Sequence, residues 1–393
     1  MSSGKFELRC LRCRELGAGF ATRCPSCGGA MEPRFLRPPR IRAGESNPLR
    51  RYFEFLPLED VEAAVWTGAP EPTPCRRAPV LEDALRHRPI YLKDETTHPS
   101  RTTKDRMASV VLSSFRELGV RAFASSSTGN SSTSLARGLA RFPELTGHLY
   151  CGEAFLGAMN WPDLENVHLY VLEGASFVEA FEAARAAGSR TVASEGGFFN
   201  PARRAGLKLA FFEAVEQVPA PIEWYFQAIS SGMGVLGTWQ GALELEAAGV
   251  LSRRPRLCCV QQASCAPMVA AWREGAATIA AHHVVAQPRG PARAILRGDP
   301  SATYPYLREI VSASGGTFEA VDAVEIAAAQ ALVREAEGLS VCAAAACTVA
   351  ALRKLVGAAA VRPGETVLLN LTGGDREPVT PTRYTWLRRV GGE

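Results

Sequence analysis

Short apolar runs alternate with stretches of helical composition along most of the chain. Ala-rich segments such as 176–187 and 323–337 are expected to form helices between strands. Strands and helices that alternate at this spacing predict an α/β fold of βαβ units with a mainly parallel sheet, in which ligands collect at the carboxyl ends of the strands. The runs that we predict to be strands are 89–95, 121–127, 147–152, 168–174, 224–230, 256–262 and 366–374.

Length and charge narrow the classes of protein that the chain can belong to. At 393 residues the chain exceeds what one hydrophobic core usually organises, so more than one domain is expected. A net charge of +4 argues against a dedicated nucleic-acid binder. Six arginines crowd the segment 34–51, which is either a solvated linker or a surface for nucleic acid or a protein partner: Arg34, Arg37, Arg40, Arg42, Arg50 and Arg51.

The sequence predicts neither a membrane segment nor a signal peptide. No run approaches the roughly 18 apolar residues that a spanning helix needs, and the start Met-Ser-Ser-Gly-Lys-Phe lacks an apolar core. We therefore expect a cytoplasmic protein that does not bind membranes. In that reducing compartment the eleven cysteines are expected to bind metal or to fill the core rather than to form disulfides.

Four cysteines follow a metal-binding pattern. Cys10, Cys13, Cys24 and Cys27 form C-x2-C-x10-C-x2-C, which can supply four thiolates to a tetrahedral structural zinc. Two unrelated CxxC pairs or a redox dithiol are the alternatives. We expect the other seven to be small core residues: Cys75, Cys151, Cys258, Cys259, Cys265, Cys342 and Cys347.

Two loops and one lysine carry the candidate chemistry. The loop 125–136, "SSSTGNSSTSLA", follows a predicted strand and opens a helix, so its amides and hydroxyls suit a small anion. The loop 230–237, "SSGMGVLG", has glycines that let backbone amides approach a phosphate. Taken alone, each loop is either an anion site or a plain serine- and glycine-rich turn. Lys104 begins a predicted amphipathic helix. By itself it is either a surface lysine paired with Asp105 or an amine nucleophile.

The order of the motifs resembles a known enzyme group. "KDETTHPSRTTKDRMAS", "SSSTGNSSTSLA", "YFQAISSGMGVLGTWQGAL" and "LLNLTGGD" follow one another as in the fold type II pyridoxal-phosphate enzymes of the threonine synthase group, from about Asn47 to Asp375. Within this group, "PLRRYFEFLPL", "EGGFFNPARRAGLK" and "CCVQQASCAPMVAAW" most resemble the cysteate synthases. The resemblance implies a tryptophan synthase β-like fold with two parallel-sheet domains. The implied division is a zinc ribbon at 1–36, a large cofactor domain of 37–110 with 200–393, and a small domain at 111–199.

The resemblance also implies the roles of individual residues. Lys104 would hold pyridoxal 5′-phosphate as an imine, Asn130 would bond an oxygen on its ring, and Thr372 would meet its pyridine nitrogen. The substrate carboxylate would face Ser127, Thr128 and Ser131. Apart from the resemblance, a leaving phosphate needs cations, and an arginine fork matches phosphate oxygens. The candidates, each of them otherwise a plain surface charge, are Arg101, which we predict to bind substrate, Arg106, Arg203 and Arg204. The residues implied to cradle the cofactor phosphate are Ser231, Gly232, Met233, Gly234 and Val235.

The implied activity is replacement of phosphate on an O-phospho-L-amino acid through an aminoacrylate intermediate, with O-phosphoserine and sulfite as one pair of substrates. A threonine synthase that converts O-phosphohomoserine and water to threonine and phosphate is the competing enzyme. A non-catalytic binding protein, or a regulator that uses the zinc ribbon, is the competing class. The group also implies a homodimer that binds an amino-acid substrate and a small nucleophile.

Overall fold

The computed structural model describes residues 4–17, 20–188 and 191–388, which fall into two units. Unit 1 comprises Met1–Glu71, Lys104–Gly206 and Arg376–Glu393, and unit 2 comprises Pro72–Thr103 and Leu207–Asp375. The chain therefore passes from one unit to the other between Thr103 and Lys104. The division into three domains implied by the sequence stays a prediction.

Unit 2 contains a six-stranded sheet in the order β12-β11-β10-β13-β5-β4. All neighbours are parallel except β4, which runs antiparallel to β5 at the edge. Every residue of β5, β10 and β13 is buried, as expected of parallel strands covered on both faces. The bounds are β4 Cys75–Arg77, β5 Ile90–Asp94, β10 Trp224–Ala228, β11 Arg256–Gln262, β12 Thr317–Val321 and β13 Val367–Leu371.

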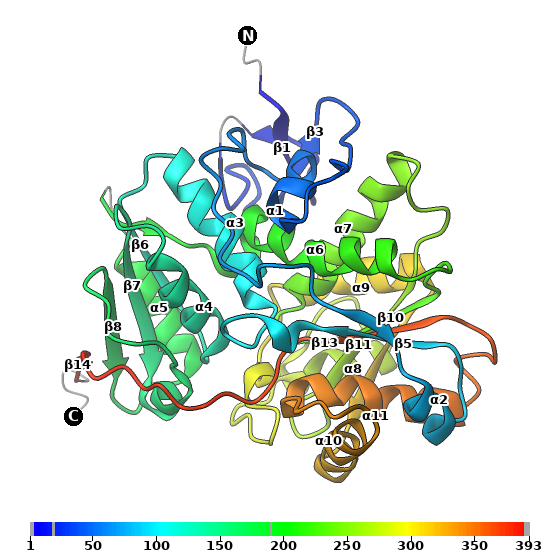
Figure 1. The fold of residues 1–393 in the computed structure, drawn as a ribbon. Coiled ribbons are helices and arrows are strands. Elements are labelled where there is room, and N and C mark those ends of the chain that lie inside the picture. Colours follow the sequence, from blue (N-terminus) through cyan, green and yellow to red (C-terminus); the bar gives the residue numbers. More distant parts are fainter. Residues whose placement is uncertain (1–3, 18–19, 189–190, 389–393) are drawn as a thin grey trace. The chain divides into compact units, whose positions relative to one another are not determined.

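Helices cover both faces of this sheet (Figure 1). One apolar core joins the sheet to α2 Pro79–Leu85, α10 Ala323–Glu337 and α11 Ala343–Gly357. The remaining helices of the unit are α7 Met233–Ala247, α8 Pro267–Arg273 and α9 Tyr304–Ser314, with the short turns η2 Glu95–Thr97, η5 Ala281–His283 and η6 Arg293–Ile295. The helix α6 Pro201–Gln217 begins in unit 1 and ends in unit 2.

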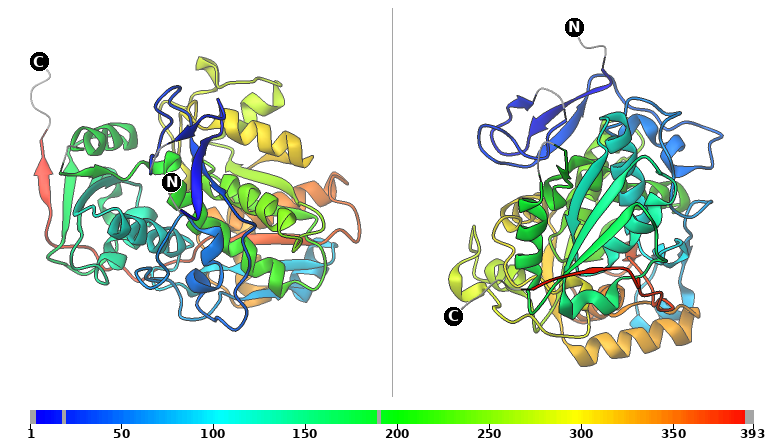
Figure 2. Two further views of the ribbon diagram at one scale, coloured as in Figure 1. Left: turned by 90° about the horizontal axis from the view of Figure 1, so that it is seen from above. Right: turned by 90° about the vertical axis from the view of Figure 1, so that its left-hand side faces the viewer.

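Unit 1 contains a five-stranded parallel sheet in the order β14-β8-β7-β6-β9, whose central strands lie side by side in the right panel of Figure 2. The bounds are β6 Ala122–Ser126, β7 Thr146–Gly152, β8 Val167–Leu172, β9 Ala193–Ser194 and β14 Thr385–Leu387. The helices are α3 Lys104–Glu117, α4 Asn130–Leu139 and α5 Phe177–Ala186, with η3 Glu153–Ala158 and η4 Gly197–Phe199.

The N-terminal part of unit 1 is an antiparallel ribbon in the order β2-β1-β3, with β1 Phe6–Cys10, β2 Leu16–Gly17 and β3 Met31–Phe35. The connector that follows contains α1 Pro48–Arg51 and η1 Phe53–Phe55. The ribbon is fastened to α6, because the buried guanidinium of Arg204 donates to the backbone oxygen of Met31. Next to it, a Cβ on Gly196 would lie 2.7 Å from Cγ2 of Thr22, so glycine permits the close approach.

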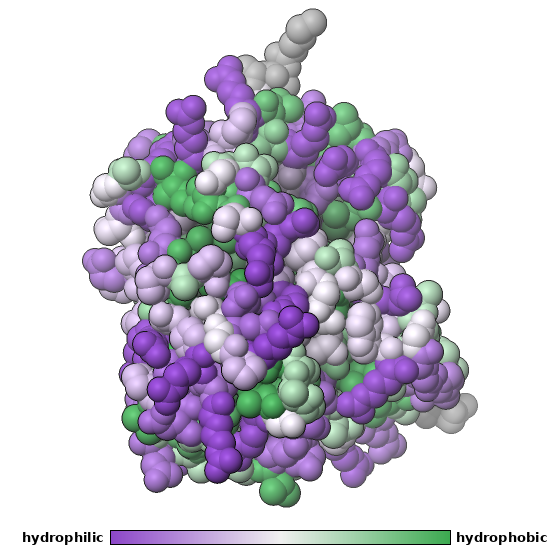
Figure 3. All heavy atoms as spheres, turned by 90° about the vertical axis from the view of Figure 1, so that its right-hand side faces the viewer, coloured by the Kyte–Doolittle hydropathy of each residue, from purple (hydrophilic) through white to green (hydrophobic). Residues whose placement is uncertain are grey.

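Each of the seven predicted strands and both predicted helices is present, and the predicted α/β fold with mainly parallel sheets is confirmed. None of the helices in the described part of the chain is long and apolar enough to cross a membrane. Figure 3 shows hydrophilic side chains interspersed with smaller apolar areas on one face, which is ordinary for the surface of a globular protein.

Candidate functional site

Lys104 is the first residue of α3, and the residues before it pair with the end of β13. The amide of Thr103 donates to the carbonyl oxygen of Thr372 at 3.0 Å, and Thr102 forms a bridge with Gly373. A Cβ on Gly373 would lie 2.9 Å from the carbonyl oxygen of Arg101, so this approach favours glycine. The pairing brings Thr372 beside the residue that precedes Lys104. Lys104 itself is half-buried.

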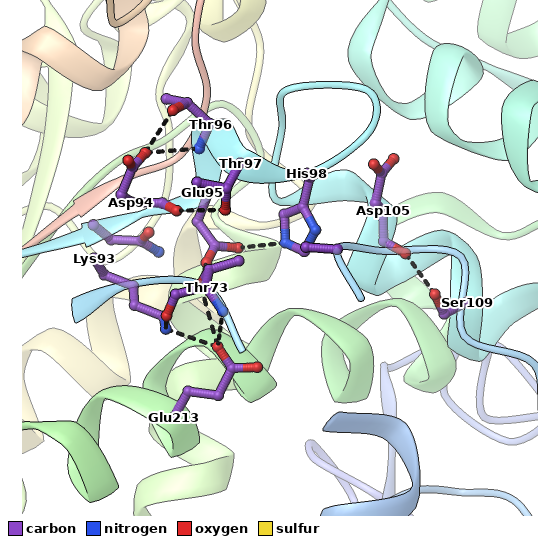
Figure 4. A network of polar contacts seen from close by, with 12 residues as sticks. Thr73, Lys93, Asp94, Glu95, Thr96, Thr97, His98, Asp105, Ser109 and Glu213 are labelled. Carbon is purple, nitrogen blue, oxygen red and sulfur yellow. Dashed lines mark hydrogen bonds and ion pairs between the residues drawn. The ribbon is translucent and has the colours of Figure 1, made fainter. Parts of the chain in front are cut away.

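A buried polar network anchors the segment that leads to this lysine (Figure 4). Nζ of Lys93, on β5, lies 2.7 Å from Oε2 of Glu213. Thr73 donates to Oε1 of Glu95 at 2.7 Å, and Oε2 of Glu95 lies 3.3 Å from Nε2 of His98. Sequence reasoning missed this network, although a lysine inside an otherwise apolar strand signals a buried partner. The amine of Lys93 is therefore occupied by a buried ion pair with Glu213 that stabilises the fold.

The loop after β6 is held by its own hydroxyl groups. Oγ of Ser127 accepts from the amides of Gly129 at 3.1 Å and Ser132 at 2.9 Å, and donates to Oγ of Ser132. Ser127 thus fixes the turn that opens α4. Among the described residues, the hydroxyls of Thr128 and Ser131 have no hydrogen-bond partner, so they retain the capacity to bind a carboxylate.

Two further polar groups of this loop bear on the site. Oγ of Ser126, in a residue only 8% exposed, also has no hydrogen-bond partner within the described ranges, and sequence reasoning did not single it out. Asn130 is the first residue of α4, and its Oδ1 accepts from Nη2 of Arg376 at 2.7 Å. Arg376 was missed as well, because its partner lies 246 positions earlier in the chain.

The loop after β10 has the backbone features of an anion-binding turn. Gly232 has φ 78° and precedes α7, a helix of 15 residues for which no side-chain cap is present among the described residues. The first amides of a helix have no acceptor within the helix and carry its positive dipole. A Cβ on Gly234 would lie 2.3 Å from Nε2 of Gln227, and a Cβ on Gly232 would lie 2.6 Å from Leu307. The glycines and open amides, with buried Ser231 beside them, fit a phosphate group.

Three hydrogen-bonded side chains of the sheet in unit 2 form a layer that packs against this loop: Tyr225, Gln227 and Asn370. Tyr225 donates to Oε1 of Gln227 at 2.7 Å, and Nδ2 of Asn370 donates to the hydroxyl of Tyr225 at 2.6 Å. Burial raises the pKa of Tyr225 well above its usual range, so this hydroxyl stays protonated as a donor. The layer fixes Gln227 against the backbone of Gly234.

Three of the four candidate arginines are buried in protein contacts. Nε of Arg203 lies 3.2 Å from Oε1 of Glu195, and Arg204 donates to the carbonyl oxygen of Phe198 at 2.5 Å. Arg106 is fully buried, with its guanidinium 5.9 Å from the centre of the Trp66 ring. Arg101 has φ 51°, and in the described part of the chain its buried Nε has no hydrogen-bond partner. Nη2 of Arg101 donates to the carbonyl oxygen of Ser340 at 3.4 Å. Within the described residues Nη2 of Arg203 is also buried without a hydrogen-bond partner, so Arg101 and Arg203 each retain a guanidinium donor for a further acceptor.

The four ribbon cysteines meet at one point. Sγ of Cys10 and of Cys13 each lie 3.4 Å from Sγ of Cys27, and Cys13 lies 3.6 Å from Cys24. A tetrahedral zinc with bonds of about 2.3 Å needs sulfur atoms about 3.8 Å apart, so the cluster fits that ion after small shifts. Burial raises the pKa of the Cys10 thiol, but amides of Cys13 and Arg12 outweigh it and lower the pKa to about 7. The other cysteines are buried or half-buried.

A second cluster has metal-binding residue types but a different arrangement. Oε2 of Glu274 lies 3.0 Å from Nε2 of His282 and 2.9 Å from Nε2 of His283. Nδ1 of His283 accepts from the amide of Ala280, so a neutral ring carries its proton on Nε2 and donates it to Glu274. That tautomer has no lone pair for a metal at Nε2, and the cluster is a hydrogen-bonded group.

Comparisons with known proteins agree with the fold and the motifs. A family model described as "Pyridoxal-phosphate dependent enzyme" matches residues 67–373. Threonine synthase from Methanocaldococcus jannaschii is 28% identical over 338 residues, which cover 84% of this chain and 80% of that protein. Cysteate synthase from Methanosarcina barkeri is 26% identical over 401 residues, which cover 94% of this chain and 92% of that protein.

A solved structure extends the likeness to nearly the whole fold. Threonine synthase from Escherichia coli matches with a TM-score of 0.70 at 14% identity, covering 97% of this chain and 96% of that chain. The fold expected from the sequence is thereby confirmed.

Proposed function

The chain belongs to the pyridoxal-phosphate dependent enzyme family, and on that premise we propose that it replaces the phosphate of an O-phospho-L-amino acid with a small nucleophile. O-phosphoserine and sulfite are the preferred pair. The observation that carries this proposal is the similarity to cysteate synthase and threonine synthase, which covers 94% and 92% of this chain respectively. The phosphate-suited start of α7 and the hydroxyl-rich start of α4 support it.

The residues of the two loops and the lysine would divide the work of binding. Lys104 would carry the cofactor, and the amides of Met233, Gly234 and Val235 would hold its phosphate. Asn130 would donate to the ring oxygen, and the hydroxyl of Thr372 would meet the pyridine nitrogen. Bound in this way, the cofactor supplies an electron sink that acidifies the Cα–H bond of the substrate.

The remaining steps fall to groups of the chain. Once the substrate amine has replaced Lys104 on the cofactor, the freed amine of Lys104 would remove the Cα proton as a general base. Thr128 and Ser131 would bind the substrate carboxylate, while Ser127 keeps the loop in shape. The guanidinium of Arg101 would bind the departing phosphate, because its fork of donors matches phosphate oxygens. Thr372 is a neutral partner for the nitrogen, which suits expulsion of a good leaving group.

Threonine synthase is the second candidate, and the 28% identity to the Methanocaldococcus jannaschii enzyme favours it. Both reactions begin with removal of the same proton. They differ in the substrate phosphate, which lies one methylene farther from Cα in O-phosphohomoserine. A homodimer and a cytoplasmic location remain predictions from the sequence.

One experiment separates the two candidates. Purified protein loaded with cofactor is offered O-phosphoserine or O-phosphohomoserine, each with sulfite or with water alone, and phosphate release and products are measured. We expect phosphate from O-phosphoserine and cysteate when sulfite is present. Because a misplacement of about 1 Å can cost about a hundredfold in rate, the other substrate should react far more slowly. Release at least about tenfold faster from O-phosphohomoserine, with threonine as product, would establish the second candidate instead.

A further inference from the structure

The contact between Arg376 and Asn130 fixes which end of the asparagine amide is available to a ligand. Nη2 of Arg376 donates to Oδ1 of Asn130 at 2.7 Å. A guanidinium has donors and no acceptor, so it can bond only the oxygen end of a carboxamide. Nδ2 of Asn130 is then the end left over, and it has no hydrogen-bond partner in residues 4–17, 20–188 and 191–388. With its oxygen end turned toward Arg376, Asn130 presents the Nδ2 donor end to a ligand.

A segment that we name the C-terminal strap, residues 376–387, delivers this arginine. Nδ2 of Asn160 donates to the carbonyl oxygen of Glu377 at 2.7 Å, directly beside Arg376. Asn160 is itself held by Arg137 of α4, whose Nη2 donates to Oδ1 of Asn160 at 2.6 Å. The strap ends in β14, which pairs with β8 at the edge of the five-stranded sheet (Figure 1).

Farther along, the strap has another attachment. The amide of Thr382 donates to Oδ1 of Asp163 at 3.0 Å, and β14 follows two residues after Arg383. All these contacts lie within unit 1. The position of Arg376 is therefore set by several contacts of the strap with the unit that carries Asn130.

The donor end of Asn130 indicates the kind of ligand that the amide serves. Because its oxygen end is turned toward Arg376, the amide offers a ligand an N–H group. Such a donor bonds a deprotonated oxygen more strongly than a neutral one. The arrangement fits an acceptor that carries negative charge.

We propose that Arg376 is a positioning residue that holds the Asn130 amide as a hydrogen-bond donor to the deprotonated ring oxygen of the cofactor. This rests on the proposed binding of pyridoxal 5′-phosphate at Lys104 and Asn130, and not on the identity of the amino-acid substrate. Without the guanidinium, the amide can turn and accept from a protonated ring hydroxyl. The variant would then bind the cofactor with its ring oxygen either protonated or deprotonated.

The test compares Arg376→Met and Arg376→Lys with wild type in the absence of substrate. Two quantities are measured: the dissociation constant of the cofactor, and the absorbance of the bound cofactor as a function of pH. Losing a hydrogen bond to a charged group corresponds to about a tenfold change or more. We expect Arg376→Met to bind cofactor about tenfold more weakly and to shift absorbance from the visible toward the near ultraviolet, with partial recovery in Arg376→Lys.

Two further variants make the test specific. Arg383→Met is the matched control, because this arginine lies on the same strap and its largely exposed guanidinium is 4.0 Å from Asp163, while the hydrogen bond from its backbone amide to Asp163 does not depend on the side chain. It should behave as wild type. In an Asn130→Ala background, Arg376→Met should have no additional effect on cofactor affinity or absorbance.

The outcomes separate this proposal from the wider one. An unchanged absorbance titration in folded Arg376→Met, or an equal effect of that change with and without Asn130, overturns the positioning role. Circular dichroism and thermal melting check folding, and Arg376→Lys serves if Arg376→Met does not fold. If borohydride fixes no cofactor on Lys104 of wild type, the proposed function itself fails. If cofactor is fixed there but the Arg376 variants have the cofactor affinity and absorbance of wild type, only the positioning role fails.

Discussion

The amide of Thr103 donates a 3.0 Å hydrogen bond to the carbonyl oxygen of Thr372, although the two residues are far apart in the chain. Thr372 directly follows β13, and Thr103 directly precedes Lys104. The antiparallel bridge between Thr102 and Gly373 extends the pairing by one residue in each of the two segments. The backbone that leads into the candidate lysine is therefore fixed by the end of a central, fully buried strand.

Lys104→Ala is expected to abolish the visible absorbance of bound cofactor and to lower turnover by at least about a hundredfold, because the variant lacks both the attachment point and the base. The fold should persist, since alanine is a good helix former at the start of α3. Absorbance, turnover and circular dichroism measure the three effects.

Borohydride reduction of wild type, followed by peptide mass spectrometry, locates the attachment. Lys354→Ala is the matched control, because this half-exposed lysine interacts with Glu319 and Glu325 and should retain the absorbance. A cofactor mass on a peptide without Lys104 contradicts the assignment.

Gly234→Ala is expected to weaken cofactor binding at least about tenfold. Its Cβ would lie 2.3 Å from Nε2 of Gln227, so the loop or the glutamine must move and disturb the amides proposed to hold phosphate. Titration of apoprotein with cofactor measures the effect. Gly357→Ala is the control in the same unit, because its Cβ would meet nothing within 4 Å. Equal affinities of the two variants would remove the phosphate role of this loop.

Cys10→Ser combined with Cys24→Ser is expected to lower zinc content from about one ion per chain to near zero, because each knuckle loses a thiolate. The free energy of unfolding should fall, while soluble protein still binds cofactor. Metal analysis and thermal melting measure the two effects. Cys151→Ser is the control, since this core cysteine is outside the cluster and should leave zinc content unchanged. Full zinc in the double variant would show that other residues bind the metal.

Arg203→Met is expected to lower the free energy of unfolding by about 3 kcal/mol, because it leaves Glu195 buried without its cation. Adding Glu195→Gln should recover part of that loss. Arg185→Met is the matched control, since its ion pair with Glu182 is exposed and should contribute about 0.5 kcal/mol or less. Denaturant unfolding measures all three. A raised KM for the phosphoamino acid at unchanged stability would instead place Arg203 at the substrate.

The sequence by itself determined those features whose signal is local. Strands such as 224–230 are recognisable because a parallel strand buried on both faces is an unbroken apolar run. The CxxC knuckles, the hydroxyl loop at Ser127 and the glycine loop at Gly232 are likewise complete within a few residues. The order of these motifs was enough to place the chain in its enzyme family.

Only the tertiary structure decided which polar side chains meet. Lys93 pairs with Glu213 across 120 positions, and Arg376 reaches Asn130 across 246. It also showed that Arg203 and Arg204 bind protein groups, where the sequence left them as candidates for a substrate phosphate. The physical reason is that a charged residue indicates the need for a partner when it is buried, but neither its burial nor its partner is encoded nearby in the chain. Both depend on how distant strands and helices pack.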